Sequence, residues 1–407
     1  MQSSNQGLRT ARNPIVILIA GSICVLMAMG LRASQGLFLK PMSVDLGWGR
    51  EIFAFAMALQ NLIWGGVQPF AAAISEKWGT GRVIAGGGLL YAAGLYLMAS
   101  TSDPLSFHIT AGLLIGIAQS GSGLAVVLGV VGRAMPAEKR SWGLGIVTAA
   151  GAAGQFTVVP IGQIFLSQYG WSTSLLLLAL LAVAIVATAP AMKGRVDTLA
   201  SATDGSSSLR AAVSEAASHR GFWLLTAGFF VCGFHVAFIG VHLPAYLADA
   251  GMPAGTGAWA LALIGFFNVI GCFIAGYLGD RQRKKYLLSM LYILRSLVFL
   301  AFIMVPVSTA SVLAFSSTIG LLWLSTVPLT SGLVGQIFGP RYMGTLFAIV
   351  FFSHQVGSFL GIWLGGYFYD LVGSYMPVWW ASVALGLASA LLHWPINDRT
   401  LVRTANA

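Results

Sequence analysis

Long apolar segments recur along this chain and limit the folds that it can adopt. A helix that crosses the hydrocarbon core of a bilayer needs roughly 20 apolar residues, and segments of this kind follow one another through the sequence. Hydrophobic residues make up 57% of the chain and charged residues only 8%, against about 25% charged in an ordinary soluble domain. The sequence therefore predicts an all-α membrane protein with twelve transmembrane helices. The predicted spans are 14–39, 51–74, 83–101, 105–131, 141–167, 171–192, 221–248, 257–278, 286–306, 311–334, 342–369 and 374–396.

The basic residues lie mostly in the connections on one side of these predicted helices. The chain carries 22 Lys and Arg against 12 Asp and Glu, a net charge of +10, and only Lys40 and Arg50 lie in connections on the opposite side. Because short cytoplasmic loops collect Lys and Arg, both termini are predicted to be cytoplasmic. The same charge suits contact with anionic membrane lipids, so nucleic acid is not expected as a partner.

The most polar connection divides the predicted helices into six and six. Residues 193–220 are rich in Ser, Ala and charged residues, which is typical of a solvated linker. The two flanking parts echo each other, because Glu76-Lys77 follows the second predicted helix and Asp280-Arg281 follows the eighth. Such internal repeats are common in transporters. The predicted domains are an N-terminal six-helix bundle, 1–192, a cytoplasmic linker, 193–220, and a C-terminal six-helix bundle, 221–407.

These two connections resemble a loop pattern of the major facilitator superfamily, Gly-x-x-x-Asp-Arg-x-Gly-Arg-Arg. The second half keeps the pattern at Gly276, Asp280 and Arg281, and the first half has a degenerate form at Ala72, Glu76, Lys77, Gly79 and Arg82. The resemblance implies the major facilitator fold, in which two pseudo-symmetric six-helix bundles move a substrate by alternating access. It also implies that Glu76, Lys77, Asp280 and Arg281 belong to gating loops.

Two further segments narrow this resemblance. "GRAMPAEKRSWGLGIVTAAGAAGQ" and "SHQVGSFLGIWLGGYFYDLVGSY" resemble bacterial members of the branch that contains monocarboxylate porters and oxalate/formate exchangers. The resemblance implies a monocarboxylate substrate and a location in the bacterial inner membrane. An arginine that this branch often carries about eight residues before the loop aspartate is replaced by Cys272. The substrate-binding role of that arginine therefore does not transfer to this chain.

Buried cations without buried carboxylates define the expected substrate. Arg32 and Arg295 lie inside predicted helices, whereas no Asp or Glu lies near the middle of any predicted span. Intramembrane charges usually mark a substrate or ion pathway, and a guanidinium binds a carboxylate through two parallel hydrogen bonds. We therefore expect the substrate to be a small organic anion. The expected substrate-binding residues are Arg32, Gln35, Gln119, Asn268 and Arg295.

Each arginine also has a structural interpretation. Arg32 lies near one end of its predicted helix, where its long side chain can reach the membrane interface or pair with Asp45 or Asp249. Arg295 lies in a helix that the resemblance makes peripheral, where it can stabilise helix packing through backbone carbonyls or Asn268. The sequence leaves both interpretations open.

Three histidines lie in apolar segments. His235 and His242 are seven residues apart on one predicted helix and share nearly the same face, and His354 lies in another helix. Imidazoles titrate near physiological pH, so these three are candidates for carrying a coupled proton. The alternative is a neutral histidine that forms hydrogen bonds between helices. Too few ligands accompany them for a metal site, and the three cysteines lack metal or redox spacing, so neither a metal nor a cofactor is expected.

These observations predict a secondary active transporter and not an enzyme. No ATP-binding motif is present, so symport with protons or exchange of substrates is expected to supply the energy. The expected partners are a small organic anion, protons and membrane lipids, and the expected functional unit is a monomer. Two other functions stay open, namely export of neutral or amphiphilic drugs and metabolites, and a non-transporting membrane sensor of a metabolite.

Overall fold

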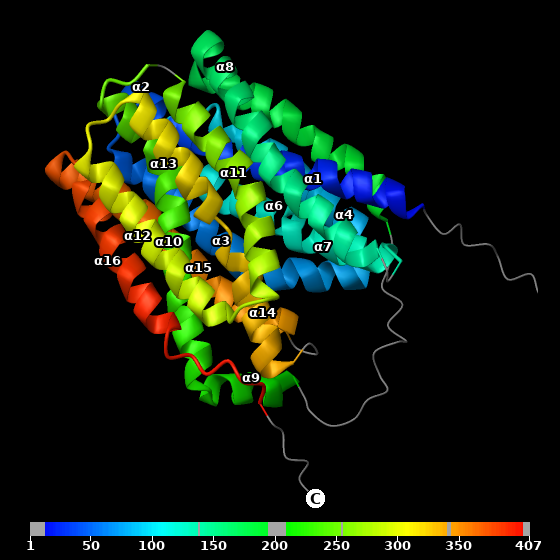
Figure 1. Ribbon diagram of the computed structural model, residues 1–407. Coiled ribbons are helices and arrows are strands. Elements are labelled where there is room, and N and C mark those ends of the chain that lie inside the picture. Colours follow the sequence, from blue (N-terminus) through cyan, green and yellow to red (C-terminus); the bar gives the residue numbers. More distant parts are fainter. Residues whose placement is uncertain (1–12, 137–138, 194–208, 254, 340–342, 402–407) are drawn as a thin grey trace, which may run out of the picture.

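Helices account for every regular element that the structure describes. The computed structural model describes residues 13–136, 139–193, 209–253, 255–339 and 343–401, and no strand occurs within these ranges. The helices run alongside one another in one bundle (Figure 1). A helix satisfies its own backbone hydrogen bonds, which is what a lipid environment demands. The predicted all-α membrane architecture is confirmed. Most of the predicted linker, from 194 to 208, lies outside the described residues.

The first half of the chain contains helices of very different lengths. Two membrane-crossing segments consist of consecutive pieces. A 3-10 element (η1) separates the α-helical stretches of one, and a π-helical element (η2) separates those of the other. The elements are α1 (Pro14–Ser34), η1 (Gln35–Phe38), α2 (Leu39–Asp45), α3 (Arg50–Trp78), α4 (Thr80–Met98), α5 (Pro104–Phe107), η2 (His108–Leu114), α6 (Ile115–Ser122), α7 (Leu124–Ala134), α8 (Arg140–Thr188) and η4 (Ala189–Met192).

The second half begins with a short amphipathic helix and continues with longer ones. One membrane-crossing segment is again broken, between α13 and α14. The elements are α9 (Leu209–Ser218), α10 (Arg220–Asp249), α11 (Thr256–Gly279), α12 (Lys284–Met304), α13 (Thr309–Leu322), α14 (Thr326–Phe338), α15 (Met343–Val372) and α16 (Met376–His393).

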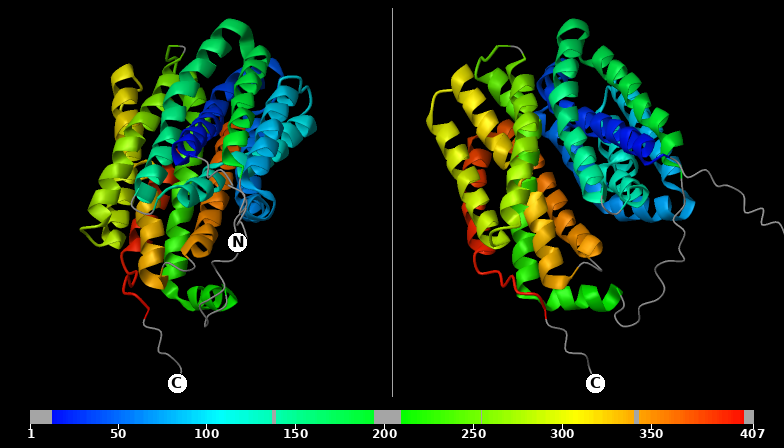
Figure 2. Two further views of the ribbon diagram at one scale, coloured as in Figure 1. Left: turned by 90° about the vertical axis from the view of Figure 1, so that its right-hand side faces the viewer. Right: turned by 45° about the vertical axis from the view of Figure 1, so that its right-hand side comes forward.

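The number of membrane crossings depends on how the helices are divided. Among the described residues, 10 helical segments are long and apolar enough to cross a membrane. One of them, Trp142–Met192, covers two predicted spans, and at Gly170 its backbone has a φ of 75°, where the chain forms an arch (Figure 2). Only glycine adopts this conformation without strain. Helix α3 occupies the predicted span 51–74 but is not among the 10, so the count of twelve stays a prediction.

The helices form two groups that meet at one end. Figure 2 shows α1 to α8 on one side and α10 to α16 on the other, with the ribbons diverging toward the end that carries α9. We call residues 13–193 the first half, residues 209–401 the second half, and the two ends of the molecule the Arg50 end and the α9 end. Between the halves, α3 packs on α15 and α8 packs on α11. The predicted domain boundaries at 192 and 220 stay a prediction.

Glycines allow the closest helix crossings. A Cβ at Gly154 of α8 would overlap the backbone of Leu26 in α1, and a Cβ at Gly233 of α10 would overlap the carbonyl of His354 in α15. Small residues at such crossings let backbones approach, and van der Waals contact then holds helices together where lipid provides no hydrophobic driving force. These crossings fix the positions of α1 and α15, both of which carry residues of the candidate site.

Gly154→Ala is expected to destabilise the protein, because the added methyl group has no room unless α1 and α8 separate. Overpacking of this kind costs about 1–3 kcal/mol, which should lower the midpoint of thermal unfolding in detergent. Gly145→Ala on the same helix is the matched control, since nothing lies within 4 Å of a Cβ there and alanine favours helix over glycine. Equal midpoints for the two variants would contradict this account of the α1–α8 crossing.

Candidate functional site

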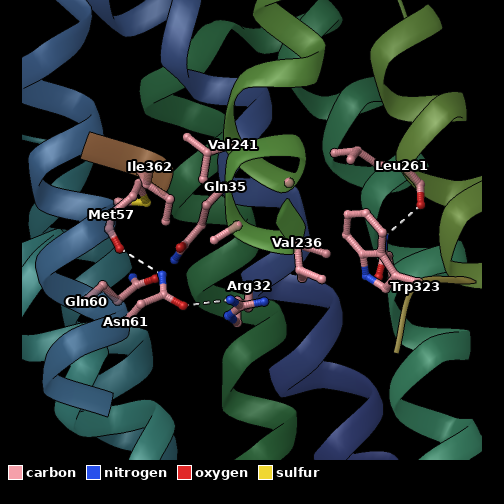
Figure 3. A pocket seen from close by; sticks show the side chains of 14 residues that line it. Arg32, Gln35, Met57, Gln60, Asn61, Val236, Val241, Leu261, Trp323 and Ile362 are labelled. Carbon is pink, nitrogen blue, oxygen red and sulfur yellow. Dashed lines mark hydrogen bonds between the residues drawn. The ribbon is translucent and has the colours of Figure 1, made fainter. Parts of the chain in front are cut away.

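A small cavity lies between the two halves. Its volume is about 50 Å³, and residues of α1, η1, α3 and α8 line it from the first half while residues of α10, α11 and α15 line it from the second. Figure 3 shows Arg32, Asn61 and Gln60 gathered with Gln35 on one side of the cavity, with Trp323 toward the other. The cavity thus has a polar wall that comes mainly from the first half and faces largely apolar residues of the second.

Arg32 extends from the last turn of α1 into this cavity. Its Nη2 donates a hydrogen bond of 2.7 Å to Oδ1 of Asn61, and its guanidinium carbon lies 5.1 Å from the ring centre of Trp64. Its Nε is buried and has no hydrogen-bond partner among the described residues. A desolvated guanidinium is costly unless an acceptor or a counter-charge compensates it. Arg32 therefore has one neutral acceptor, and the N–H of its buried Nε has none among the described residues.

The carboxylates that the sequence suggested as partners for Arg32 are engaged elsewhere. Asp45 accepts a hydrogen bond of 2.7 Å from Nε1 of Trp171. Asp249 accepts two hydrogen bonds from Arg50, at 2.6 and 2.9 Å. Neither of these two acids neutralises the guanidinium of Arg32.

Four amide side chains line the cavity together with Arg32, and one of them has a free donor. Gln35 is 2% exposed, and its Nε2 has no partner among the described residues. It follows Arg32 by three residues, so helical geometry directs both side chains to the same face. The other three amides donate to backbone carbonyls: Gln60 to Ala111, Asn61 to Met57 and Gln155 to Leu261.

Gln60, Asn61 and Gln155 were not among the predicted site residues. In the sequence they are polar residues within apolar segments, and that signal does not say which face of a helix they occupy. Only the packing of the helices places all three in the lining of the cavity that holds Arg32.

Two predicted amides lie outside the cavity lining. Nε2 of Gln119 donates to the hydroxyl of Tyr91 at 3.5 Å. Oδ1 of Asn268 accepts a hydrogen bond of 3.0 Å from the backbone N–H of Leu324, at the break between α13 and α14. Both residues are buried and have partners within their own half of the chain. Their substrate-binding role stays a prediction.

Arg295 also lies away from the cavity lining, although it is buried and points inward from α12. Only 1% of the residue is exposed. Its Nε donates to the carbonyl of Leu322 at 3.0 Å, and its Nη2 donates to the carbonyls of Leu322 and Trp323. These carbonyls lack helical partners because α13 ends there. The geometry fits the structural interpretation of Arg295, and its predicted contact with substrate stays untested.

His235 and His242 lie on α10 and bond within the second half. Nε2 of His235 is 2.9 Å from the carbonyl oxygen of Ser382. Nε2 of His242 is 2.7 Å from the carbonyl oxygen of Ile362, and its Nδ1 is 3.3 Å from the hydroxyl of Tyr375. Both side chains are buried. These are the contacts expected of histidines that link helices, and they leave the proton-coupling role untested.

His354 is the candidate histidine with a connection toward the cavity. Its Nδ1 lies 3.1 Å from Oε1 of Gln355, and Nε2 of Gln355 donates to the backbone carbonyl of Asn61 at 3.0 Å. This contact crosses from α15 in the second half to α3 in the first. Through Asn61 it reaches Arg32.

The predicted gating residues lie at helix ends, far from this cavity in the fold. Lys77 is exposed near the end of α3, and Asp280 and Arg281 are exposed after α11. The guanidinium of Arg281 lies 3.5 Å from the ring centre of Tyr277. The side chain of Glu76 lies outside what the structure describes. The gating role of these loops stays a prediction.

Comparison with known protein families identifies the family of this chain. The model of the Major Facilitator Superfamily matches residues 21–362, which is most of its length. This chain belongs to the Major Facilitator Superfamily. The resemblance predicted from the two loops is therefore confirmed.

Individual relatives in the superfamily are distant. The uncharacterized MFS-type transporter YcxA of Bacillus subtilis (strain 168) is 24% identical over 389 residues, which cover 90% of this chain and 91% of the relative. Monocarboxylate transporter 13 of Rattus norvegicus is 26% identical over 314 residues, covering 75% and 71%. A crystal structure of the nucleoside transporter NupG matches with a TM-score of 0.77 at 12% identity, covering 93% of this chain and 99% of that one. The chain therefore has the fold of a major facilitator transporter.

In this superfamily member, charged and aromatic residues join the two halves at the Arg50 end. The guanidinium of Arg50, at the start of α3, forms its paired hydrogen bonds with Asp249 of α10 and donates to the hydroxyl of Tyr375 at 2.7 Å. Lys40 pairs with the same aspartate at 2.9 Å, and Asp370 accepts the backbone N–H of Arg50 at 2.9 Å. We call these five residues the Arg50 latch.

The latch was not predicted from the sequence, although the positions of its charged residues in the sequence are unusual. Lys40 and Arg50 are the two basic residues on the side opposite the termini, and Asp249 is a carboxylate at the end of an apolar segment. Close packing adds to the latch, since a Cβ at Gly36 of η1 would overlap the carbonyl of Gly240 in α10. The halves are therefore held together between the cavity and the Arg50 end.

Removing either charge of the central pair is expected to open the Arg50 end. Arg50→Gln leaves Asp249 with Lys40 as its remaining cation, and Asp249→Asn leaves both Arg50 and Lys40 without their carboxylate. A cysteine placed at Ala237, which lines the cavity, should then react at least about fivefold faster with a membrane-impermeant maleimide added on the Arg50 side, a typical size for a coupling between two states.

The charge-exchanged double variant, Arg50→Asp with Asp249→Arg, should recover only part of the protection, because the new arginine also faces Lys40. Asp45→Asn is the matched control, because its partner Trp171 belongs to the same half. Identical labelling rates in the intact protein and in both single variants would show that the latch does not hold the halves together.

Proposed function

We propose that this protein is a secondary active transporter of a small organic anion, a monocarboxylate, and that Arg32 binds the carboxylate. One observation carries the proposal. Arg32 brings a guanidinium into a cavity between the halves, where its Nε and the neighbouring Nε2 of Gln35 are buried donors without acceptors among the described residues. An anion would supply both the missing acceptors and the missing negative charge.

The cavity geometry suits a short acid. The two donors lie on the polar wall, where the two oxygens of one carboxylate would accept from Arg32 and Gln35. The opposite wall includes Val236, Val241 and Trp323, which would contact the hydrocarbon part of the substrate. A volume of about 50 Å³ favours a molecule of few atoms in this conformation.

Transport would follow alternating access between the two halves. If the connections that carry most Lys and Arg are cytoplasmic, the Arg50 end faces outward, and the Arg50 latch closes the outer side in the conformation described. Rocking of the halves would then expose the cavity to either side. The location would be the bacterial inner membrane, with both termini in the cytoplasm, the protein would act as a monomer, and proton symport or anion exchange would supply the energy.

The relatives support the substrate class at the level of their names. Monocarboxylate transporter 13 of Rattus norvegicus and monocarboxylate transporter 11 of Mus musculus are each 26% identical to this chain. The absence of a carboxylate beside Arg32 adds a physical reason, since a cationic substrate would require one. The likeness to NupG concerns the fold alone.

Arg32→Gln is expected to abolish uptake of the anion. The test uses the intact chain in proteoliposomes with radiolabelled lactate, pyruvate, glycolate and oxalate, with and without an inward proton gradient, against protein-free liposomes. Loss of a buried charge-assisted pair should reduce uptake at least about 100-fold. Arg32→Lys should retain a fraction, because an ammonium keeps the charge but loses the planar pair of donors.

Arg283→Gln is the matched control, because it removes an arginine that pairs with Asp398 outside the cavity lining. Its uptake should stay within about twofold of the intact protein, because neither Arg283 nor Asp398 lines the cavity. If none of the four acids enters in any condition, or if Arg32→Gln transports as well as the intact protein, the organic-anion proposal fails. Transport of a neutral compound would favour the exporter, and binding without flux would favour the sensor.

A further inference from the structure

Gln355 forms a fully buried contact between the two halves. It lies on α15 and faces α3, and none of its surface is exposed. Its Nε2 donates to the backbone carbonyl of Asn61, and its Oε1 lies 3.1 Å from Nδ1 of His354. A buried polar side chain is costly unless its groups are paired, and here the amide has a partner on each side, one in each half of the protein.

The orientation of the Gln355 amide determines which ring nitrogen of His354 carries a hydrogen. A backbone carbonyl only accepts hydrogen bonds, so the amide must turn its NH₂ group toward Asn61 and its oxygen toward His354. That oxygen also only accepts, so Nδ1 of His354 must carry a hydrogen. In the neutral imidazole the lone pair then lies on Nε2, which is where a proton would bind.

The same chain of contacts continues to the proposed anion site. Oδ1 of Asn61 accepts the hydrogen bond from Arg32, while the backbone carbonyl of Asn61 accepts the one from Gln355. Asn61 therefore connects the cavity cation with the amide that holds His354. His235 contacts the carbonyl of Ser382, and His242 contacts the carbonyl of Ile362 and the hydroxyl of Tyr375. Among the described residues, neither histidine has a hydrogen-bonded path to Arg32.

Other groups around His354 supply no carboxylate. From α10 the thiol of Cys232 interacts with His354, and the Arg295 guanidinium of α12 interacts electrostatically with that thiol. The rings of Phe229 and Phe351 lie 5.1 and 5.4 Å from the imidazole, the second one stacked. From α3 the chain of contacts described above leads to Arg32. The hydroxyl of Ser358 lies 3.5 Å from Nδ1, farther than the oxygen of Gln355 at 3.1 Å. The oxygen of Gln355 is therefore the nearer acceptor that would stabilise a charged imidazole.

The fold makes room for this side chain with a glycine. A Cβ at Gly65 of α3 would lie 2.6 Å from Cγ of Gln355 and 2.8 Å from its Cβ. Real Cβ atoms do not approach other atoms so closely, so a larger residue would displace the Gln355 side chain. A substitution of Gly65 would therefore disturb the contact without removing the amide group of Gln355.

We infer that Gln355 is a positioning residue that couples a proton on His354 to the anion bound at Arg32. The inference rests on the proposed function. A hydronium ion of the aqueous phase gives a proton to the Nε2 lone pair of His354, so that one O–H bond breaks, one N–H bond forms and a water molecule is left. The imidazolium then donates a charge-assisted hydrogen bond from Nδ1 to Gln355. An anion that engages Arg32 acts on Asn61 through the hydrogen bond from Arg32 to Oδ1, and the proton acts on the backbone carbonyl of the same residue through Gln355. Both ligands therefore act on Asn61, from opposite sides.

The test compares two modes of transport in proteoliposomes of the full chain. Gradient-driven uptake uses an inward proton gradient, and exchange uses equal pH with unlabelled substrate inside, for whichever of lactate, pyruvate, glycolate or oxalate the intact protein accumulates. Gln355→Leu is expected to lower the ratio of gradient-driven uptake to exchange by at least about tenfold, with exchange itself retained. His354→Gln should lower the ratio similarly.

Two further variants separate this role from a general packing defect. Gly65→Ala should lower the same ratio by displacing Gln355, and Gln355→Asn, which keeps an amide, should retain more coupling than Gln355→Leu. Gln336→Leu is the matched control, since it makes the same change on α14, where the amide contacts Lys284 and Asp398. Its ratio should equal that of the intact protein.

The outcomes distinguish the two proposals. If the intact protein carries none of the acids, the proposed function fails before coupling is tested. If it accumulates an acid but Gln355→Leu and Gly65→Ala leave the ratio unchanged, the inference about Gln355 is overturned while the proposed function stands. An intact protein that exchanges an acid but shows no response to a proton gradient also overturns the inference.

Discussion

The centre of this structure depends on how the guanidinium of Arg32 is compensated between the two helical bundles. Burying a cation away from water costs several kcal/mol unless acceptors or a counter-charge compensate it. Around Arg32 the protein provides the neutral oxygen of Asn61 and the ring of Trp64, but the structure places no carboxylate among the residues that line the cavity. This partial compensation keeps the site polar and leaves a place for an anion.

The second buried arginine shows a different solution to the same problem. Arg295 lies in the core of the second half and donates to the carbonyls of Leu322 and Trp323, where α13 stops before α14 begins. A break in a membrane helix exposes carbonyls that need donors, and a buried guanidinium needs acceptors. The arginine and the helix break therefore stabilise each other, although Nη1 of Arg295, like Nε of Arg32, is buried without a partner among the described residues.

The contacts between the halves differ in kind along the molecule. At the Arg50 end they are ion pairs, with Arg50 and Lys40 on Asp249, partly exposed so that water screens them. Around the cavity they are neutral, such as the amide of Gln355 on the carbonyl of Asn61 and that of Gln155 on Leu261. Neutral hydrogen bonds can exchange partners at small net cost. Such an interface suits halves that rock, with the latch adding a stronger hold at one end.

The sequence by itself determined the all-α membrane architecture, because only helices satisfy backbone groups in long apolar segments, and the loop pattern around Asp280 indicated the superfamily. It also identified Arg32 and Gln35, since their spacing places them on one helical face. Only the tertiary structure decided that Asn61 contacts both Arg32 and Gln355, that Arg295 bonds to a helix break, and that Arg50 pairs with Asp249. These contacts join residues far apart in the chain, and local periodicity gives the face of a helix but not the helix that it packs against.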